Sequence, residues 1–209
     1  MIPDSVNIFT SAVSQLIGDD LQVVILAGSF ARGEEKPTSD IDLFLLVENL
    51  DIQTMKEIGE LVKSISTDHE LNPAVVKLSE FIKYPDWFDL LKLRHEGIVL
   101  FGKIPENLRA NEDELTAAKR IAKEVLMSAR HYLAVSEPIE KFTGSKLFIY
   151  ILKPLAFALR LYHYANSGSY ILKTSDLARE YPILDLDPVS DFKRIIEESS
   201  RICEEIMNS

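Results

Sequence analysis

The sequence has little of what marks secreted, disulfide-bonded or membrane-spanning proteins. Its 209 residues include one cysteine, Cys203, which excludes an internal disulfide and is typical of a reducing compartment such as the cytoplasm. The first twenty residues lack a basic segment and a long apolar core, so we expect no signal peptide. The longest apolar stretch, residues 147–164, contains charged residues and a proline, which favours a buried helix over a membrane span.

Basic residues are also scarce, with 23 Lys and Arg against 33 Asp and Glu and a net charge of −10. Residues 1–105 hold 9 basic and 17 acidic residues, so most of the acidic excess lies in the first half. Bulk binding of nucleic acid draws on many Lys and Arg side chains, and we do not expect it here. A small nucleotide needs only a local site and stays compatible with this charge.

The order of apolar patterns in the first half predicts an α+β domain. This order, α-β-β-α-β-α-β, is typical of a mixed sheet flanked by helices. A polar segment around Pro105 reads as a linker, so we place this first domain at residues 1–104. Helical spacing marks residues 3–17, 55–65 and 79–93, and strand-like runs mark residues 23–26, 43–47, 71–78 and 98–101.

Beyond the linker the pattern predicts helices alone, and we expect residues 105–209 to form an all-α helical bundle. Residues 148–164 are apolar nearly all round, as in the central helix of a bundle. Pro154 lies inside this helix and should kink it. Further helical patterns cover residues 115–133, 174–181 and 192–206.

Two acids stand at the head of an apolar strand. Asp40 and Asp42 are two residues apart, so in a strand their carboxylates project side by side and repel each other unless a cation lies between them. Mg²⁺ or Mn²⁺ favours carboxylate oxygen and completes its shell with water and phosphates. The pair therefore predicts a metal site. The alternative is structural, with Asp40 closing an Asx turn in the preceding loop.

A glycine and a serine precede the acids, directly after the strand that ends at Leu26. The backbone at Gly28 and Ser29 can donate to phosphate oxygens, and glycine lets a ligand approach closely. The Ser29 hydroxyl adds a further donor. Arg32 and Lys36 follow in the loop, where they either contact phosphates or are ordinary solvated surface charges.

Gly28-Ser29, ten residues and then Asp40-Ile41-Asp42 resembles the GS-x10-D-x-D signature of the polymerase-β-like nucleotidyltransferase superfamily. Arg32-Gly33 and Ser39 resemble its small prokaryotic members. The second half resembles only loosely the helical bundles of aminoglycoside nucleotidyltransferases. The resemblance implies that Asp40 and Asp42 hold metal ions while an acceptor hydroxyl attacks the α-phosphorus of a nucleoside triphosphate and pyrophosphate leaves.

The resemblance also implies a third acid on the neighbouring strand, a metal ligand and general base. The middle of residues 71–78 has none. We assign the role to Glu70, and Asn72, Asp68 or no third ligand remain alternatives. An Asn can ligate a metal but cannot act as a base. The second hypothesis is therefore a nucleotide-binding regulatory module with weak or lost turnover, for example in a toxin–antitoxin-like system.

In the second half, Lys146, Lys153 and Arg160 are spaced by seven, so we expect them along one side of a helix and away from a dry core. They are either snorkelling surface cations or a stripe that meets the triphosphate in a cleft between the domains. The four histidines show no metal-ligand spacing, and we assign them no role: His69, His95, His131 and His163.

The sequence thus predicts a Mg²⁺- or Mn²⁺-dependent nucleotidyltransferase that moves a nucleoside monophosphate, AMP from ATP, to a hydroxyl of a small molecule or protein. Its expected partners are a nucleoside triphosphate and that acceptor, in the cytoplasm and without a membrane. A homodimer is left open, as are the acceptor and the base preference.

Overall fold

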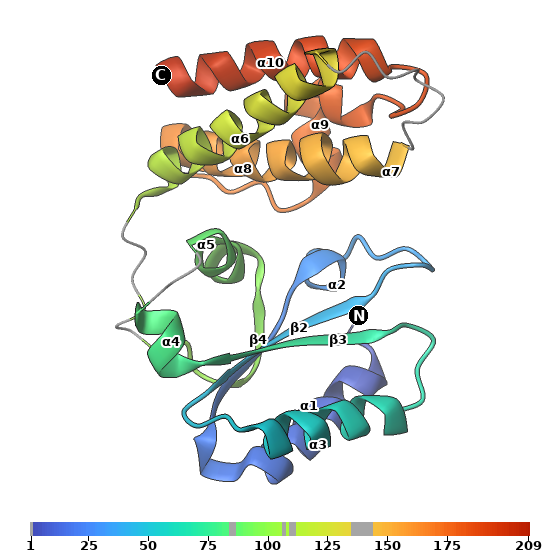
Figure 1. Ribbon diagram of the computed structural model, residues 1–209, viewed down its shortest axis with the longest axis vertical. Helices are drawn as coiled ribbons and strands as arrows, with labels where there is room; N and C mark the ends of the chain where they lie inside the picture. Colours follow the sequence, from blue (N-terminus) through green and yellow to red (C-terminus); the bar gives the residue numbers. More distant parts are fainter. Residues whose placement is uncertain (1, 84–86, 106–107, 109–111, 135–143) are drawn as a thin grey trace. The chain divides into compact units, whose positions relative to one another are not determined.

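The computed structural model describes residues 2–83, 87–105, 108, 112–134 and 144–209 (Figure 1). The chain divides into two compact units, Met1–Asn111 and Glu112–Ser209. The predicted domain bounds, 1–104 and 105–209, stay a prediction. Each unit is described by itself.

The first unit, called the sheet unit, contains four strands in the order β3-β2-β1-β4. The central strand β1 (Leu21–Leu26) pairs antiparallel with β2 (Ile41–Val47) and with β4 (Ile98–Gly102). Strand β3 (Leu71–Lys77) lies parallel to β2 at the edge. The predicted mixed sheet is confirmed.

Helices cover both faces of this sheet, and the alternation along β2 decides which face each helix covers. Leu43 belongs to a buried cluster with Phe9 of α1 and Ile58 of α3, whereas Phe44 belongs to a second cluster with Leu90 of α5. In Figure 1, α1 and α3 accordingly lie together on one side of the sheet. The helices are α1 (Asp4–Ile17), a 3₁₀ turn η1 (Gly18–Asp20), α2 (Gly28–Arg32), α3 (Ile52–Ser64), α4 (Leu78–Lys83) and α5 (Trp87–Glu96).

The second unit, called the helical unit, is all helical among its described residues, as predicted. Helix α6 contacts both α8 and α10, and α8 is buried nearly all round from Leu155 to Leu161. Its elements are α6 (Glu114–Ala134), α7 (Gly144–Leu147), a π-helical segment η3 (Phe148–Leu152), α8 (Lys153–Ser167), α9 (Thr174–Glu180), a 3₁₀ turn η4 (Pro182–Asp185) and α10 (Phe192–Asn208).

Pro154 does not end the central helix. The chain instead takes a π-helical form at Phe148–Leu152, directly before it, and the Lys153 N–H donates to the Phe148 carbonyl. Such π segments are a known cause of kinks. A π-helical segment thus precedes Pro154 within the helix, and the kink at the proline stays a prediction.

The prediction that Lys146, Lys153 and Arg160 share a solvated side is wrong for Arg160. Lys146 and Lys153 are exposed, but Arg160 is only 4% exposed. Its Nε donates to the Ile171 carbonyl at 3.1 Å and its Nη2 to Thr174 Oγ1 at 2.7 Å. The chain after α8 supplies these acceptors, so the buried guanidinium has its hydrogen-bond partners. The spacing of residues within a helix gives no information about a segment that follows the helix.

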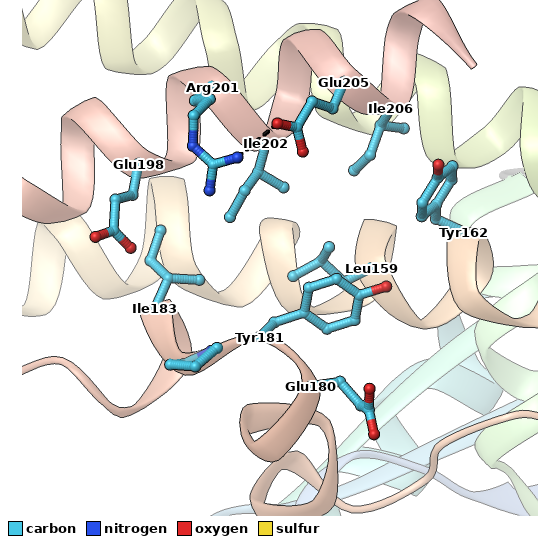
Figure 2. A pocket seen from close by; sticks show the side chains of 11 residues that line it. Leu159, Tyr162, Glu180, Tyr181, Ile183, Glu198, Arg201, Ile202, Glu205 and Ile206 are labelled. Atoms are coloured by element: carbon cyan, nitrogen blue, oxygen red, sulfur yellow. Dashed lines mark hydrogen bonds and ion pairs between the residues drawn. The ribbon is translucent and has the colours of Figure 1, made fainter.

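The helical unit also contains a cavity of about 160 Å³ between α8, η4 and α10, drawn in Figure 2. The charged side chains that α10 contributes to this cavity are paired along that helix. Arg201 Nη1 lies 2.5 Å from Glu205 Oε1, and Arg194 Nε donates to Glu198 Oε1 at 2.9 Å.

In the parts of the chain that the structure describes, no helix is long and apolar enough to cross a membrane.

Candidate active site

The two acids of the signature meet on one face of the sheet. Asp42 lies in β2, in register with Asn72 of β3, and Asp40 lies two residues earlier, just before β2 begins. The Asn72 Nδ2 donates to Asp40 Oδ2 at 3.4 Å and to Asp42 Oδ1 at 3.3 Å. Ile41, between the acids, is fully buried on the other face. The predicted side-by-side arrangement is therefore present, with one amide bridging both carboxylates.

Gly28 brings the chain against this pair in a way that no other residue can. Its φ is +67°, a region that L side chains rarely adopt. A Cβ at Gly28 would lie 2.1 Å from Asp42 Oδ2, well inside van der Waals contact. Ser29 follows in the first turn of α2, where backbone N–H groups have no partner within the helix. Glycine thus lets the start of α2 approach the Asp42 carboxylate.

The two carboxylates have no ion-pair partner among the described residues. The Asn72 amide between them carries no charge. Two adjacent carboxylates without a counter-charge repel each other. This arrangement fits a hard divalent cation such as Mg²⁺, which binds one or two carboxylates and takes its other ligands from water and phosphates.

Asn72, rather than Glu70, is the third polar side chain at the pair. Glu70 is exposed, and its backbone carbonyl accepts a hydrogen bond from Ile41 N at 2.8 Å. Among the described residues no three or more His, Cys, Asp or Glu side chains are grouped so as to hold a metal. The roles of Glu70 as ligand and base stay predictions, and the position beside Asp42 belongs to an amide.

Arg32 has carboxylate partners inside the sheet unit. Its Nε lies 2.8 Å from Glu34 Oε2 and its Nη1 lies 2.8 Å from Oε2 of Glu96, whose side chain is 2% exposed. Burial lowers the pKa of the Arg32 guanidinium, but the hydrogen bonds and charges of Glu34 and Glu96 outweigh it, so the pKa is raised. Arg32 therefore links α2 to α5, and its phosphate contact stays a prediction.

The other predicted cations are exposed. Lys36 lies in the loop before β2, where its backbone N–H donates to Ser39 Oγ at 2.9 Å. Lys146 and Lys153 belong to the helical unit. The structure does not test whether any of the three contacts a nucleotide, and these contacts stay predictions.

Sequence reasoning missed a cation at the site. A cavity of about 130 Å³ adjoins the pair, and Lys92 of α5 lines it together with Asp42 and Asn72. The packing of α5 on the sheet brings Lys92 there from fifty residues along the chain. The available signal was a lone lysine between Leu91 and Leu93, which are both buried in the structure. The cavity lining consists of Ala27, Asp42, Leu43, Phe44, Asn72, Ala74, Lys92 and Leu93.

A mixed sheet with two adjacent carboxylates beside a glycine turn places this chain among enzymes that transfer nucleotidyl groups. A family model described as a nucleotidyltransferase domain matches residues 6–142, which is well over half of the chain. The chain therefore belongs to the nucleotidyltransferase-domain family, and the predicted family and enzyme class are confirmed.

A curated relative agrees with this family. The MJ0141 protein of Methanocaldococcus jannaschii, named provisionally as a protein adenylyltransferase, is 34% identical over 74 residues, which cover 33% of this chain and 73% of that protein.

Among solved structures, spectinomycin adenyltransferase AAD(9) of Enterococcus faecialis, with ATP and spectinomycin, matches with 13% identity and a TM-score of 0.48, covering 98% of this chain and 97% of its own. A toxin–antitoxin structure with AMP-PNP matches with 20% identity and a TM-score of 0.36, covering 61% and 93%. With TM-scores under one half, neither supports a conclusion about this chain.

Proposed function

We propose that this chain transfers AMP from ATP to an acceptor hydroxyl in a reaction that depends on Mg²⁺ or Mn²⁺, in the cytoplasm. The observation that carries the proposal is the pair Asp40 and Asp42, held side by side with no ion-pair partner among the described residues and with Gly28 in close contact with Asp42. The name of the Methanocaldococcus relative supports adenylyl transfer.

Each residue of the site has a role in this scheme. Asp40 and Asp42 hold the metal ions, and the bound ions would neutralise and orient the triphosphate and the leaving pyrophosphate. Gly28 leaves room for the Asp42 carboxylate beside the start of α2, and the Ser29 backbone N–H and hydroxyl would donate to phosphate oxygens. Lys92, which lines the same cavity as Asp42, supplies a positive charge.

The acceptor must lose a proton as it attacks, and Asn72 cannot take it. We assign the base to Glu70, which precedes β3 and is exposed to solvent. The provisional name of the Methanocaldococcus relative favours a protein acceptor over a small molecule. A hydroxyl of Ser, Thr or Tyr on a partner protein is the acceptor class that we propose.

The test uses ATP labelled at the α-phosphate, Mg²⁺, and a panel of acceptor proteins and small molecules. Asp42→Asn keeps the shape of the side chain but removes its charge, and we expect it to lower the transfer rate by more than about 100-fold, beyond the loss typical of an outer-shell change. Its unfolding temperature should stay the same or rise, because one repelling charge is gone.

Asp185→Asn is the matched control, an exposed Asp at the end of η4 in the helical unit. It should transfer label as the wild type does. Undiminished transfer by the Asp42→Asn variant would contradict the proposed function.

One observation favours a second candidate, a module that binds nucleotide and turns it over slowly or not at all. The side chain in register with Asp42 is the amide of Asn72, and no third acid joins the pair among the described residues. Saturable binding of ATP with Mg²⁺, without pyrophosphate release across the whole acceptor panel, would support this candidate over the enzyme.

A further inference from the structure

The imidazole of His69 contacts two segments that adjoin the candidate active site. His69 lies between α3 and β3, and its Nδ1 is 2.7 Å from the Ser39 carbonyl oxygen. A carbonyl can only accept, so Nδ1 carries the proton in this contact. The same ring meets the Phe30 ring edge-on, with centroids 4.9 Å apart and planes at 80°.

These two contacts adjoin the residues that form the site. Ser39 directly precedes Asp40, and Phe30 directly follows Ser29. Fixing the Ser39 carbonyl fixes the peptide that leads into Asp40. His69 therefore contacts both the segment that carries the first acid and the helix that carries the phosphate-binding turn.

The two acids differ in how much the sheet itself holds them. Asp42 lies inside β2, its carbonyl accepts from Ala27 N at 2.8 Å, and it is in register with β3. Asp40 precedes the strand, at the end of a loop that closes on itself through the Ser39 N–H bond to the Lys36 carbonyl at 2.9 Å. On its C-terminal side Asp40 is held by the Ile41 N–H bond to the Glu70 carbonyl at 2.8 Å, whereas the Ser39 carbonyl on its N-terminal side has no partner in the ladder and bonds to His69 instead.

His69 is itself held in place from the body of the sheet unit. Its backbone N–H donates to Thr67 Oγ1 at 3.2 Å, and Thr67 Oγ1 donates to Ser5 Oγ of α1 at 3.3 Å. A chain of hydrogen bonds therefore runs from α1 through Thr67 and His69 to the peptide of Asp40. The segment before β3, which contains Thr67 and His69, therefore holds the loop before β2 through the Ser39 carbonyl.

We propose that His69 is a positioning residue, whose Nδ1–H holds the Ser39 carbonyl so that Asp40 stays beside Asp42. Its effect on metal and nucleotide binding rests on the proposed function of the site. Its effect on the loop does not, and can be measured in the protein alone.

Two substitutions separate the donor from the ring. His69→Phe keeps an aromatic ring against Phe30 but removes the N–H donor. His69→Asn removes the ring but keeps a donor, because the Asn amide nitrogen stands close to where Nδ1 stood. His131→Phe is the control, the same change at an exposed histidine of α6 in the helical unit.

The first measurement is hydrogen–deuterium exchange in the peptide that spans residues 36–42. We expect this peptide to exchange about three to ten times faster in His69→Phe, the factor that loss of one neutral hydrogen bond gives, and at nearly the wild-type rate in His69→Asn. The second is Mn²⁺ titration in the presence of a non-hydrolysable ATP analogue, in which His69→Phe should weaken binding by the same factor.

The outcomes are distinct. Equal exchange in wild type and His69→Phe overturns the proposal, and so does equal acceleration in both His69 variants, since the ring rather than the donor would then matter. Restored exchange in His69→Asn supports it. Wild-type protein that binds no Mn²⁺ with nucleotide contradicts the proposed function, whereas the exchange result still decides whether His69 holds the loop.

Discussion

The acid pair of the sheet unit and the buried Arg160 of the helical unit hold charge in opposite settings. In the sheet unit, Asp40 and Asp42 lie together with only the neutral Asn72 amide between them, as far as the described residues show. In the helical unit, Arg160 is buried with a partner for each donor group named above, and Arg201 is paired with Glu205 along α10.

This difference distinguishes charges that only solvate or stabilise the fold from charges that indicate a ligand. Exposed i,i+4 pairs such as Arg201–Glu205 contribute only a few tenths of a kcal/mol, and they mark a solvated helix face. Two carboxylates held together without an ion-pair partner destabilise the folded chain, so their arrangement points to a ligand that relieves the repulsion. The functional assignment therefore follows from this pair rather than from the density of charge.

Two glycines, one in each unit, give the test of this difference with the largest expected effect. Gly28 of the sheet unit and Gly168 of the helical unit both have positive φ, +67° and +72°. Alanine at either position should cost about 1–2 kcal/mol of stability, because L residues are strained in this region. Only at Gly28 does a Cβ collide with a functional group, the Asp42 carboxylate; at Gly168 nothing lies within 4 Å.

We therefore expect Gly28→Ala to weaken Mn²⁺-dependent nucleotide binding by about 100-fold, since the Asp42 carboxylate must rotate away. Gly168→Ala should bind as the wild type does while losing similar stability. Calorimetric titration and thermal unfolding of both variants give the two readouts. Equal binding by both would show that Asp42 tolerates displacement and is no metal ligand.

Arg160 gives the next largest effect, on stability rather than on binding. Arg160→Leu leaves the Ile171 carbonyl and the Thr174 hydroxyl without their donor, which should cost about 2 kcal/mol. Lys153→Leu, the same kind of change at an exposed position of α8, should stay within about 0.5 kcal/mol.

Urea unfolding followed by far-UV circular dichroism measures this difference in Arg160→Leu. Trp87, the sole tryptophan of the chain, lies in α5 of the sheet unit, so the transition of its fluorescence should move less. Equal stability of the two leucine variants would mean that the buried guanidinium is replaceable and that its hydrogen bonds are not needed.

A substitution of Asn72 has the smallest expected effect, and it tests the charge of the candidate metal site directly. Asn72→Asp adds a third carboxylate beside Asp40 and Asp42, so unfolding temperature should fall without metal and Mn²⁺ affinity should rise about tenfold. Asn49→Asp is the matched control, because Asn49 Nδ2 donates to the single acid Asp20 at 2.8 Å.

The control should show the loss of stability without the gain in metal affinity. Titration with Mn²⁺ at low ionic strength distinguishes the two variants, since screening weakens repulsion between exposed acids. An Asn72→Asp variant that binds Mn²⁺ no better than the wild type would indicate that β3 does not contribute to a metal site.

Most of the local structure was predictable from periodicity. The strand periodicity around Ile41 predicted that Asp40 and Asp42 would share a face, and helical spacing predicted α1, α3, α6 and α10. The five-residue helix α2 was not predicted, because five residues are too few to show a helical period, and the sequence indicated only a turn at Gly28 and Ser29. Arg160 was misjudged because burial depends on what folds over a helix.

The sequence by itself determined the class of the protein, since a glycine–serine turn and two strand-borne acids lie within fifteen residues and local geometry relates them. Only the tertiary structure decided which side chains join them. Parallel pairing put Asn72 opposite Asp42, and the packing of α5 brought Lys92 to the same cavity. The reason is physical: strand register and helix docking depend on the burial of whole faces, which no short stretch of sequence records.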